Sequence, residues 1–320
     1  MPGRPLSIHL AGKTMTEQRL PKDRIAIIGL GKVGAAVGHL LKSAGYEIAA
    51  VFDPQPDAVE KHIPYTGGRR AGSAAEAASY ADAVLITTND DFIAPVCRTI
   101  AQEGGLKAGS KVVHLSGAGG LDLLSAAREC GCPVASIHPI QSFADVDGAI
   151  ANIPGSTFGI TAEDEIKDWA VALVKDLKGI PIFITEKDKP LYHAAACMAS
   201  NYLTTLIHTV ETIYHHFGLD GKQAVNAFWP LIKGTLKNIE AQGTVQALTG
   251  PIARGDVETI RKHVRSLESE LPGLLKAYCV MGELAVGIAL EKKSLSEDGA
   301  ARILKIIRGG IEDEHTDKDH

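Results

Sequence analysis

The stretch IAIIGLGKVGAAVG, residues 25–38, decides the fold of the first half of the chain. It joins an apolar run to a helical pattern through Gly29-x-Gly31-x-x-Gly34. In a strand–turn–helix unit, the first glycine allows a tight turn, the second lets a pyrophosphate approach the backbone, and the third lets helix and strand pack closely. The N–H groups at the start of the helix attract an anion. The stretch therefore predicts a dinucleotide-binding turn made of Gly29, Leu30, Gly31, Lys32, Val33 and Gly34.

A second apolar run, EIAAVFD, ends in Asp53, which lies 19 residues after Gly34. An acidic side chain at this distance accepts hydrogen bonds from the ribose hydroxyls of a bound dinucleotide. Its carboxylate would repel the 2′-phosphate of NADP, and Pro54 and Gln55 follow where an arginine would suit that phosphate. The spacing therefore favours NAD as the cofactor and leaves NADP as the alternative.

Short apolar runs alternate with helical patterns from Arg24 to about Thr185. The runs are RIAIIGL, EIAAVFD, AVLITT, KVVHLS, VASIHP, TFGIT and PIFIT. Continuous rather than alternating hydrophobicity is typical of strands that are covered on both faces, which are found in parallel sheets with helices on either side. We therefore expect an α/β domain over residues 24–185, with a Rossmann-type, doubly wound and mostly parallel sheet.

The strand pattern stops after Glu186. Residues 192–218, YHAAACMASNYLTTLIHTVETIYHHFG, predict one long helix that ends at Gly218. Further helical patterns cover residues 220–241, 256–270, 273–293 and 296–308. We therefore expect an all-α domain over residues 186–310. The polar segments outside these domains predict a flexible extension over residues 1–23, with Met1 or Met15 as the start, and a disordered tail over residues 311–320.

The composition excludes several classes of function. The net charge is −5, and the basic pairs Arg69-Arg70 and Lys292-Lys293 are isolated, so we expect no nucleic-acid partner. No run approaches 18 uninterrupted apolar residues, so we expect no membrane span. The five cysteines have no disulfide-framework spacing, which suits a reducing cytosol and predicts a cytoplasmic protein.

Polar residues follow two of the predicted strands at their carboxyl ends, where open parallel sheets bind ligands. After AVLITT, we expect Thr88 and Asn89 to contact the ribose or nicotinamide, and Asp90 or Asp91 to cap the next helix. After KVVHLS, Ser116 precedes three glycines and an alanine, which leave room for a ligand. Ser116 is therefore a candidate site residue.

Hydride transfer to a carbonyl or imine requires a proton donor and a stabilising dipole. His138 and Pro139 end the strand run VASIHP, and Lys189, His193 and Asn201 lie along the start of the helical half. His193 and Asn201 are eight positions apart, which places them within roughly 80° of arc on one helix. These four residues, with Ser116, are the candidate catalytic set. Alternatively, the histidines hydrogen-bond backbone carbonyls and the helix residues line a subunit interface.

His208, Glu211 and His215 share a helix face at i, i+3 and i+7, which imitates a set of metal ligands. An exposed or interfacial face explains the same pattern, and we expect no metal site.

The stretch ALTGPIARGDVETI, residues 247–260, predicts a rigid corner between helices. Pro251 lies between two glycines, and Asp256 is placed to cap the helix that follows. Arg254 is then held just before that helix. Its guanidinium could bind a substrate carboxylate with two hydrogen bonds, or bridge two helices through a carboxylate of the protein.

Four segments, HLSGAGGLDLL, SIHPIQSFAD, LYHAAACMASNYLTTL and ALTGPIARGDVETIRKH, resemble the signatures of a poorly characterised family. Its members pair a Rossmann-like N-terminal half with a helical C-terminal half of unknown function. The resemblance covers residues 24–290. The family is similar in layout to pyrroline-5-carboxylate reductase, ketopantoate reductase and the 6-phosphogluconate and hydroxyacid dehydrogenases.

The resemblance implies an NAD(P)-dependent oxidoreductase that forms a homodimer through its helical domain. The resemblance leaves the substrate open, and our hypothesis is a small carboxylate-bearing carbonyl or imine, such as a 2-oxo acid similar to ketopantoate. The hydroxyacid-dehydrogenase pattern of a lysine followed four residues later by an asparagine is absent, because Lys189 is followed by His193. The alternative function is a dinucleotide-binding sensor or scaffold without turnover.

Overall fold

The computed structural model describes the backbone of residues 22–316 and the side chains of these residues up to 309. The chain divides after Ser200 into two compact units. Nearly all of the extension expected over residues 1–23 lies outside the described residues, as do residues 317–320.

The first unit contains an eight-stranded sheet in the order β3-β2-β1-β4-β5-β6-β7-β8. The strands are β1 (Arg24–Ile28), β2 (Glu47–Phe52), β3 (Arg69–Arg70), β4 (Ala83–Ile86), β5 (Lys111–His114), β6 (Val134–Pro139), β7 (Thr157–Ala162) and β8 (Ile180–Phe183). Neighbouring strands are parallel except β6 and β7, which are antiparallel. The order of the first six is that of a dinucleotide-binding Rossmann sheet, so the predicted fold class is confirmed.

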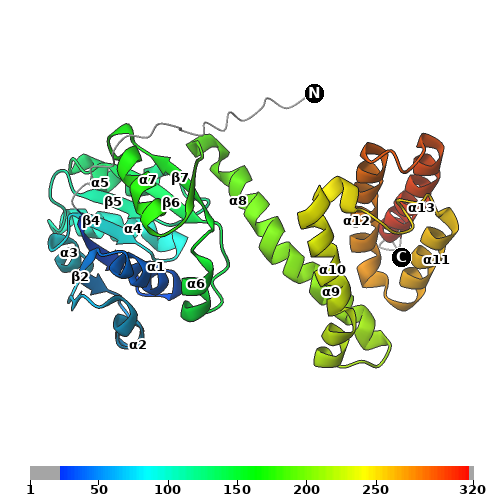
Figure 1. Ribbon diagram of the computed structural model, residues 1–320, viewed down its shortest axis with the longest axis horizontal. Coiled ribbons are helices and arrows are strands. Elements are labelled where there is room, and N and C mark those ends of the chain that lie inside the picture. The colour runs from blue at the N-terminus through cyan, green and yellow to red at the C-terminus, as the bar shows by residue number, and fades with distance from the viewer. Residues whose placement is uncertain (1–21, 317–320) are drawn as a thin grey trace. The chain divides into compact units, whose positions relative to one another are not determined.

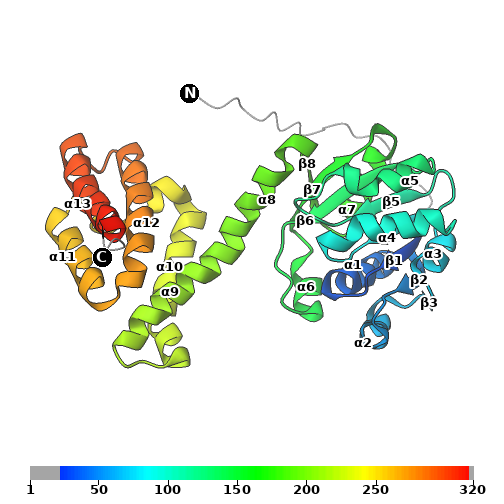
Figure 2. The same ribbon diagram turned by 180° about the vertical axis from the view of Figure 1, so that it is seen from behind.

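Helices cover both faces of this sheet (Figures 1 and 2). One face is covered by α1 (Lys32–Ser43), α2 (Pro56–Thr66), α6 (Val146–Asn152) and α7 (Lys167–Asp176), and the other by α3 (Ala74–Ser79), α4 (Asp90–Gln102) and α5 (Ser125–Glu129). In β1, Ile25 and Ile27 belong to the first core, whereas Ala26 and Ile28 belong to the second. Because both faces of the strand are buried, every position in it must be apolar.

All seven predicted strands are present, and two features of the sheet differ from the prediction. Strand β3 was missed because its two residues are both exposed arginines, which leave no apolar run to detect. The antiparallel direction of β7 was also not predicted, because the apolar content of a strand carries no information on its direction. This strand faces β6 with His138 opposite Gly159.

The second unit is helical. It is preceded in the chain by helix α8 (Lys189–Cys197), which belongs to the first unit. A π-helical turn (Met198–Tyr202) follows α8, where the sequence predicts an uninterrupted helix. The remaining helices are α9 (Leu203–His216), α10 (Gly221–Ala247), α11 (Val257–Glu270), α12 (Pro272–Glu291) and α13 (Glu297–Thr316). Gly218 follows α9 with φ +80°, as expected of a glycine after a helix end. The backbone of α13 continues into the segment 311–316, where the sequence predicts a tail, and the two glutamates of this segment are good helix formers.

The core of the second unit lies among α11, α12 and α13. Val257, Ile260 and Val264 of α11 pack there, which confirms the helical spacing read from the sequence. Among the described residues, α12 alone has the length and hydrophobicity of a membrane-spanning helix. Cys279, Val286 and Ala289 of this helix are buried in the same core, and helices in the cores of soluble proteins meet that test as well.

Candidate active site

The turn between β1 and α1 has the shape that its glycines predict. Gly29 has φ +100°, and a Cβ there would lie 2.8 Å from the backbone nitrogen of Thr88. A Cβ on Gly34 would lie 2.2 Å from the carbonyl oxygen of Gly29, so only glycine fits without a shift of the backbone. Gly31 has no atom within 4 Å of such a Cβ. The turn is therefore tightly packed at its base and open above its middle glycine.

The start of α1 is available to an anion. Gly31 occupies the N-cap position, no side chain caps the helix, and its first turn contains no acidic residue. Lys32 and Val33 are the first helical residues, and Lys32 is exposed. The N–H groups of a first helical turn have no partner within the helix and attract phosphate. Leu30 differs, because its side chain is fully buried.

Asp53 holds the turn in place. One carboxylate oxygen accepts a hydrogen bond from the backbone N–H of Leu30 at 2.8 Å, and the other accepts from that of Gln55 at 2.9 Å. The N–H of Leu30 is therefore directed at Asp53 rather than outward. The sequence assigned Asp53 to the ribose hydroxyls, and the structure adds this second task of anchoring the glycine turn.

The carboxyl end of β4 lies against the same turn. The hydroxyl of Thr87 donates to the carbonyl oxygen of Gly29 at 2.5 Å. The next hydroxyl, Thr88 Oγ1, is buried without any hydrogen-bond partner. A buried polar atom without a hydrogen-bond partner costs free energy. Because Thr88 Oγ1 lies beside the glycine turn, it is a candidate for a hydrogen bond to a bound ligand. Asn89 is exposed at the N-cap position of α4 and makes no capping hydrogen bond.

Ser116 is held between two other residues at the carboxyl end of β5. Its hydroxyl donates to Asp90 Oδ2 at 2.6 Å and accepts from the backbone N–H of Gly119 at 2.8 Å. The expectation that Asp90 or Asp91 caps α4 is therefore wrong, because Asn89 occupies the N-cap position and the Asp90 carboxylate accepts from Ser116. Spacing could not reveal this contact, since 26 residues separate the two.

His114, the last residue of β5, supports this loop from below. Its Nδ1 accepts the backbone N–H of Ser116 at 3.1 Å, and its Nε2 lies 3.0 Å from the carbonyl oxygen of Gly120. A carbonyl can only accept, so Nε2 carries the proton and the ring is neutral. Burial lowers the pKa of His114 to about 4, which agrees with that assignment.

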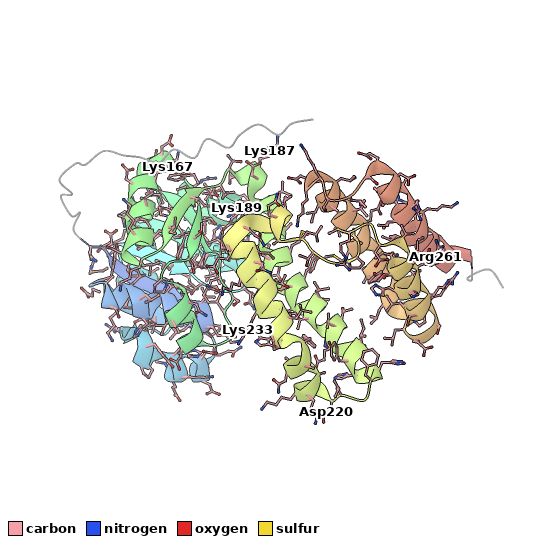
Figure 3. All side chains as sticks on the ribbon, turned by 45° about the vertical axis from the view of Figure 1, so that its right-hand side comes forward. Lys167, Lys187, Lys189, Asp220, Lys233 and Arg261 are labelled. Atoms are coloured by element: carbon pink, nitrogen blue, oxygen red, sulfur yellow. The ribbon has the colours of Figure 1, made fainter. Side chains whose placement is uncertain are left out.

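Lys189, which is labelled in Figure 3, begins α8. Its side chain is 1% exposed. Its Nζ donates to Ser136 Oγ at 2.7 Å and to the carbonyl oxygen of Ser116 at 3.3 Å. Burial lowers the pKa of Lys189 to about 8, against the opposing attraction of Asp90 and Glu186. Most of the ammonium is therefore still protonated at pH 7. A buried lysine with a lowered pKa is a characteristic feature of functional sites.

His138 and His193 meet over Gly117. Their rings pack edge to face with centroids 5.7 Å apart. A Cβ on Gly117 would lie 2.5 Å from His193 Nδ1 and 2.8 Å from His138 Nε2, so the glycine is what lets the two imidazoles approach this loop. His193 Nδ1 is buried without a partner. Burial, followed by the neighbouring His193 and Lys189, lowers the pKa of His138 to about 4.

The structure brings together four of the five candidate catalytic residues, Ser116, His138, Lys189 and His193, around the carboxyl ends of β5 and β6. Asn201 is exposed in the π-helical turn, where the second unit begins. Arg254 is exposed in the second unit, in the turn before α11. The capping role of Asp256 is confirmed by its 3.1 Å hydrogen bond from the N–H of Thr259. The proposed roles of Asn201 and Arg254 stay predictions.

The helix face with His208 and His215 holds a carboxylate between two imidazoles. Glu211 lies 3.4 Å from His208 Nδ1 and 3.6 Å from His215 Nε2. Within residues 22–316, no group of three or more histidine, cysteine, aspartate or glutamate side chains has the arrangement of a metal site. The face therefore carries two histidine–glutamate contacts.

Two domain families match the chain. Residues 11–139 match the model of a Rossmann-like domain, and residues 156–285 match a domain of unknown function, DUF2520. No curated protein matches the sequence.

Solved structures of similar fold cover nearly the whole chain. A Bacteroides fragilis protein provisionally assigned as an NADP oxidoreductase is 18% identical with a TM-score of 0.69, over 83% of this chain and 98% of that one. A Thermotoga maritima protein is 24% identical with a TM-score of 0.66, over 83% and 99%. The Plasmodium falciparum pyrroline carboxylate reductase, solved with NADP bound, is 17% identical with a TM-score of 0.56, over 87% and 97%. The chain thus joins a Rossmann-like domain to a DUF2520 domain, which confirms the family that its motifs resemble.

Proposed function

We propose that the protein is an NAD(P)-dependent oxidoreductase that reduces a small carbonyl or imine substrate bearing a carboxylate. One observation carries this proposal. The glycine turn, the buried Thr88 hydroxyl without a partner and the cluster around Ser116 and Lys189 all lie at the carboxyl edge of one sheet. Open α/β sheets bind their ligands at this edge.

The residues of the turn fit a nicotinamide dinucleotide. The open space over Gly31 and the uncapped start of α1 would receive the pyrophosphate. Thr88 and Asn89 would bind the ribose or the nicotinamide, which would satisfy the buried hydroxyl of Thr88. The bound dinucleotide supplies the hydride.

The cluster around Ser116 and Lys189 would supply the charge stabilisation and the proton that hydride transfer requires. Reduction of a carbonyl or imine leaves negative charge on oxygen or a nitrogen that must be protonated. With pKa values of about 4, the imidazoles of His114 and His138 are neutral at pH 7, so His138 can donate a hydrogen bond but holds no spare proton. Lys189 retains one, since its pKa is about 8. We assign charge stabilisation to His138 and His193, and the proton reservoir to Lys189, which donates to the Ser136 hydroxyl and to the Ser116 carbonyl oxygen.

We propose NAD as the preferred cofactor. Asp53 is fixed by two backbone N–H groups at the end of β2, so its carboxylate cannot readily turn away from a 2′-phosphate. The neighbouring arginines are engaged, Arg69 with Glu76 and the ring of Tyr80, and Arg70 with Glu60. The structurally similar Plasmodium reductase binds NADP, so direct comparison of the two cofactors is the test.

We also propose that a second copy of the chain covers apolar side chains of the second unit. Its exposed large apolar residues lie mainly on α9, α10 and α12 and include Leu206, Leu231, Met281 and Leu284. Groups of exposed apolar residues mark interaction surfaces more often than scattered single ones do. The resemblance implies dimerisation through this helical half.

The decisive experiment has two stages. Calorimetric titration with NADH and NADPH should show saturable binding of both, with a lower Kd for NADH. Asp53→Ser should bring the two Kd values closer together. The protein is then mixed with NADH and pooled 2-oxo acids and cyclic imine carboxylates, and oxidation is followed at the nicotinamide absorbance. Dinucleotide binding without turnover in the wild type would favour the alternative function, a dinucleotide-binding sensor or scaffold. Absence of binding to either dinucleotide would refute the proposal.

A further inference from the structure

Tyr192 makes a direct contact with His138 that no sequence pattern signals. Its hydroxyl oxygen lies 2.9 Å from His138 Nδ1, and the rings pack edge to face with centroids 5.6 Å apart. Tyr192 comes from α8 and His138 from β6, and 54 residues separate them. The same hydroxyl lies 3.5 Å from the carbonyl oxygen of His138, which is too long for a strong hydrogen bond.

Gly159 makes room for this hydroxyl. A Cβ on Gly159 would lie 2.4 Å from the phenol oxygen of Tyr192, so the phenol packs onto the backbone of β7. Gly159 is also the residue paired with His138 across β6 and β7. The phenol is thus confined between the imidazole and the neighbouring strand.

The chemistry of the pair decides which atom carries the hydrogen-bonding proton. Burial raises the pKa of Tyr192 to about 12, while a backbone hydrogen bond from Gly159 to the phenol oxygen opposes this shift. The phenol therefore keeps its proton, and of the two acceptors beside it His138 Nδ1 is the nearer, at 2.9 Å against 3.5 Å for the His138 carbonyl oxygen. Its O–H therefore donates to His138 Nδ1. A neutral imidazole that accepts at Nδ1 carries its single proton on Nε2.

The Nε2 atom of His138 faces Gly117, next to His193 Nδ1. Both atoms lie within 3 Å of the point where a Cβ of Gly117 would be. His193 Nε2 lies 3.6 Å from Cys197 Sγ, and its Nδ1 has no partner. The N–H of His138 is therefore directed at a place beside an unpartnered nitrogen of His193, where an oxygen or nitrogen of a bound substrate could accept it.

We propose that Tyr192 is a positioning residue that fixes His138 in the tautomer with its proton on Nε2. The consequence for catalysis rests on the function proposed above, whereas the tautomer itself does not. In that tautomer His138 presents an N–H to the oxygen or nitrogen on which charge develops. Without Tyr192, Nδ1 and Nε2 compete for the proton, and part of the population presents a bare nitrogen, which repels that charge.

The tautomer can be read by NMR on the full chain labelled with 15N-histidine, because protonated and bare ring nitrogens have different 15N shifts. His138→Gln identifies the signals by their loss. In the wild type we expect His138 to be protonated at Nε2 alone. Tyr192→Phe, which removes only the hydroxyl, should give averaged shifts for both nitrogens. Wild-type His138 protonated at Nδ1, or unchanged shifts in Tyr192→Phe, would overturn the proposal.

The chain offers a matched control in its second unit. Tyr278 and His263 form a similar pair, with Oη 2.8 Å from Nδ1 and ring centroids 5.9 Å apart in an edge-to-face packing. Tyr278→Phe should change the signals of His263 and leave those of His138 unchanged. If Tyr192→Phe does not fold, Gly159→Ala gives the same reading, because the added methyl displaces the phenol while Tyr192 remains.

Activity then separates positioning from a merely structural role. With a substrate found in the panel, Tyr192→Phe should lower kcat about tenfold, as expected for one misdirected hydrogen bond. The Kd for the dinucleotide and the Tm should stay at the wild-type values, and Tyr278→Phe should change none of these. A wild-type kcat with a changed tautomer would show that the tautomer is not used. Failure of all dinucleotides to bind would refute the proposed function and leave the NMR result intact.

Discussion

The two units differ in what they bury and what they expose. All eight buried polar or charged side chains of the described residues, from His62 to Lys189, lie in the first unit. Of the sixteen exposed large apolar side chains among residues 22–309, eleven lie in the second unit. Burial of a polar group costs free energy unless the group is hydrogen-bonded or has a function. Exposed apolar groups lower solubility. The first unit therefore has the features of a chemical site, and the second those of a surface for assembly.

The largest expected effect concerns the glycine turn of the first unit. Gly34→Ala should lower the free energy of unfolding of the first unit by about 3 kcal/mol or more, because its Cβ would lie 2.2 Å from the backbone oxygen of Gly29. Gly31→Ala should leave stability nearly unchanged, because that Cβ meets no atom within 4 Å. It should still abolish dinucleotide binding by filling the space where a pyrophosphate would lie. Urea unfolding and calorimetric titration of both variants give the two readouts.

Equal loss of stability in the two variants would mean that the turn is not open above Gly31. If both variants still bound the dinucleotide as tightly as the wild type, the dinucleotide would not bind at this turn.

Acid should destabilise the first unit selectively. The pKa values of His114 and His138 are lowered to about 4, so between pH 6.5 and 4 the unfolded chain binds more protons than the folded one. Stability present above pH 6.5 is therefore lost as the pH falls through this window, by about 3 kcal/mol for the fully buried His114. The second unit buries no histidine among its described residues.

The two tryptophans report the two units separately, Trp169 in the first and Trp229 in the second. Trp229→Phe and Trp169→Phe isolate each signal for urea unfolding between pH 7 and 4. In the Trp229→Phe background, His114→Gln should flatten the pH dependence of the Trp169 transition. Loss of stability of the Trp229 unit over the same window, at an unchanged Trp169 transition, would contradict the prediction.

The contrast between the units also separates what the sequence could reveal from what it could not. The turn from Gly29 to Gly34 and the buried strands impose constraints within a few residues, so they are visible as motif and periodicity. The seven predicted strands and the doubly wound fold follow from such local signals. In the second unit, the spacing of Val257, Ile260 and Val264 revealed α11 in the same way.

The contacts that build the site were not visible, because they join residues far apart in the chain. Ser116 was predicted, but its partner Asp90 lies 26 residues away. Lys189 was a candidate because of its position on a helix, and only the fold shows that it is buried against Ser136. Tyr192 was missed, since a tyrosine on a helix carries no signal until the strand with Gly159 and His138 is placed against it.

The apolar surface of the second unit can be tested by a single charge. Leu284, which is 58% exposed on α12, should tolerate Leu284→Glu without loss of folding. If a second copy covers it, the buried carboxylate should weaken association at least 100-fold, equivalent to about 2.7 kcal/mol. Sedimentation velocity across a concentration series measures this. Ala301→Glu, at an exposed position on α13, places the same charge on another helix of the unit and should leave association unchanged.

The smallest expected effect concerns the hydroxyl of Thr88, which is buried without a partner. Thr88→Val keeps the shape of the side chain and removes the polar atom. The protein without ligand should gain up to about 1 kcal/mol in stability, because an unsatisfied buried group disappears. The Kd for NADH should rise about three- to tenfold, because the hydrogen bond that a ligand would complete is lost. Thr87→Val, which removes the hydroxyl bonded to the Gly29 carbonyl, should instead lower stability. Opposite signs for these neighbours would show that the sheet edge holds one hydroxyl for the fold and the next for the ligand, while equal destabilisation would assign both to the fold.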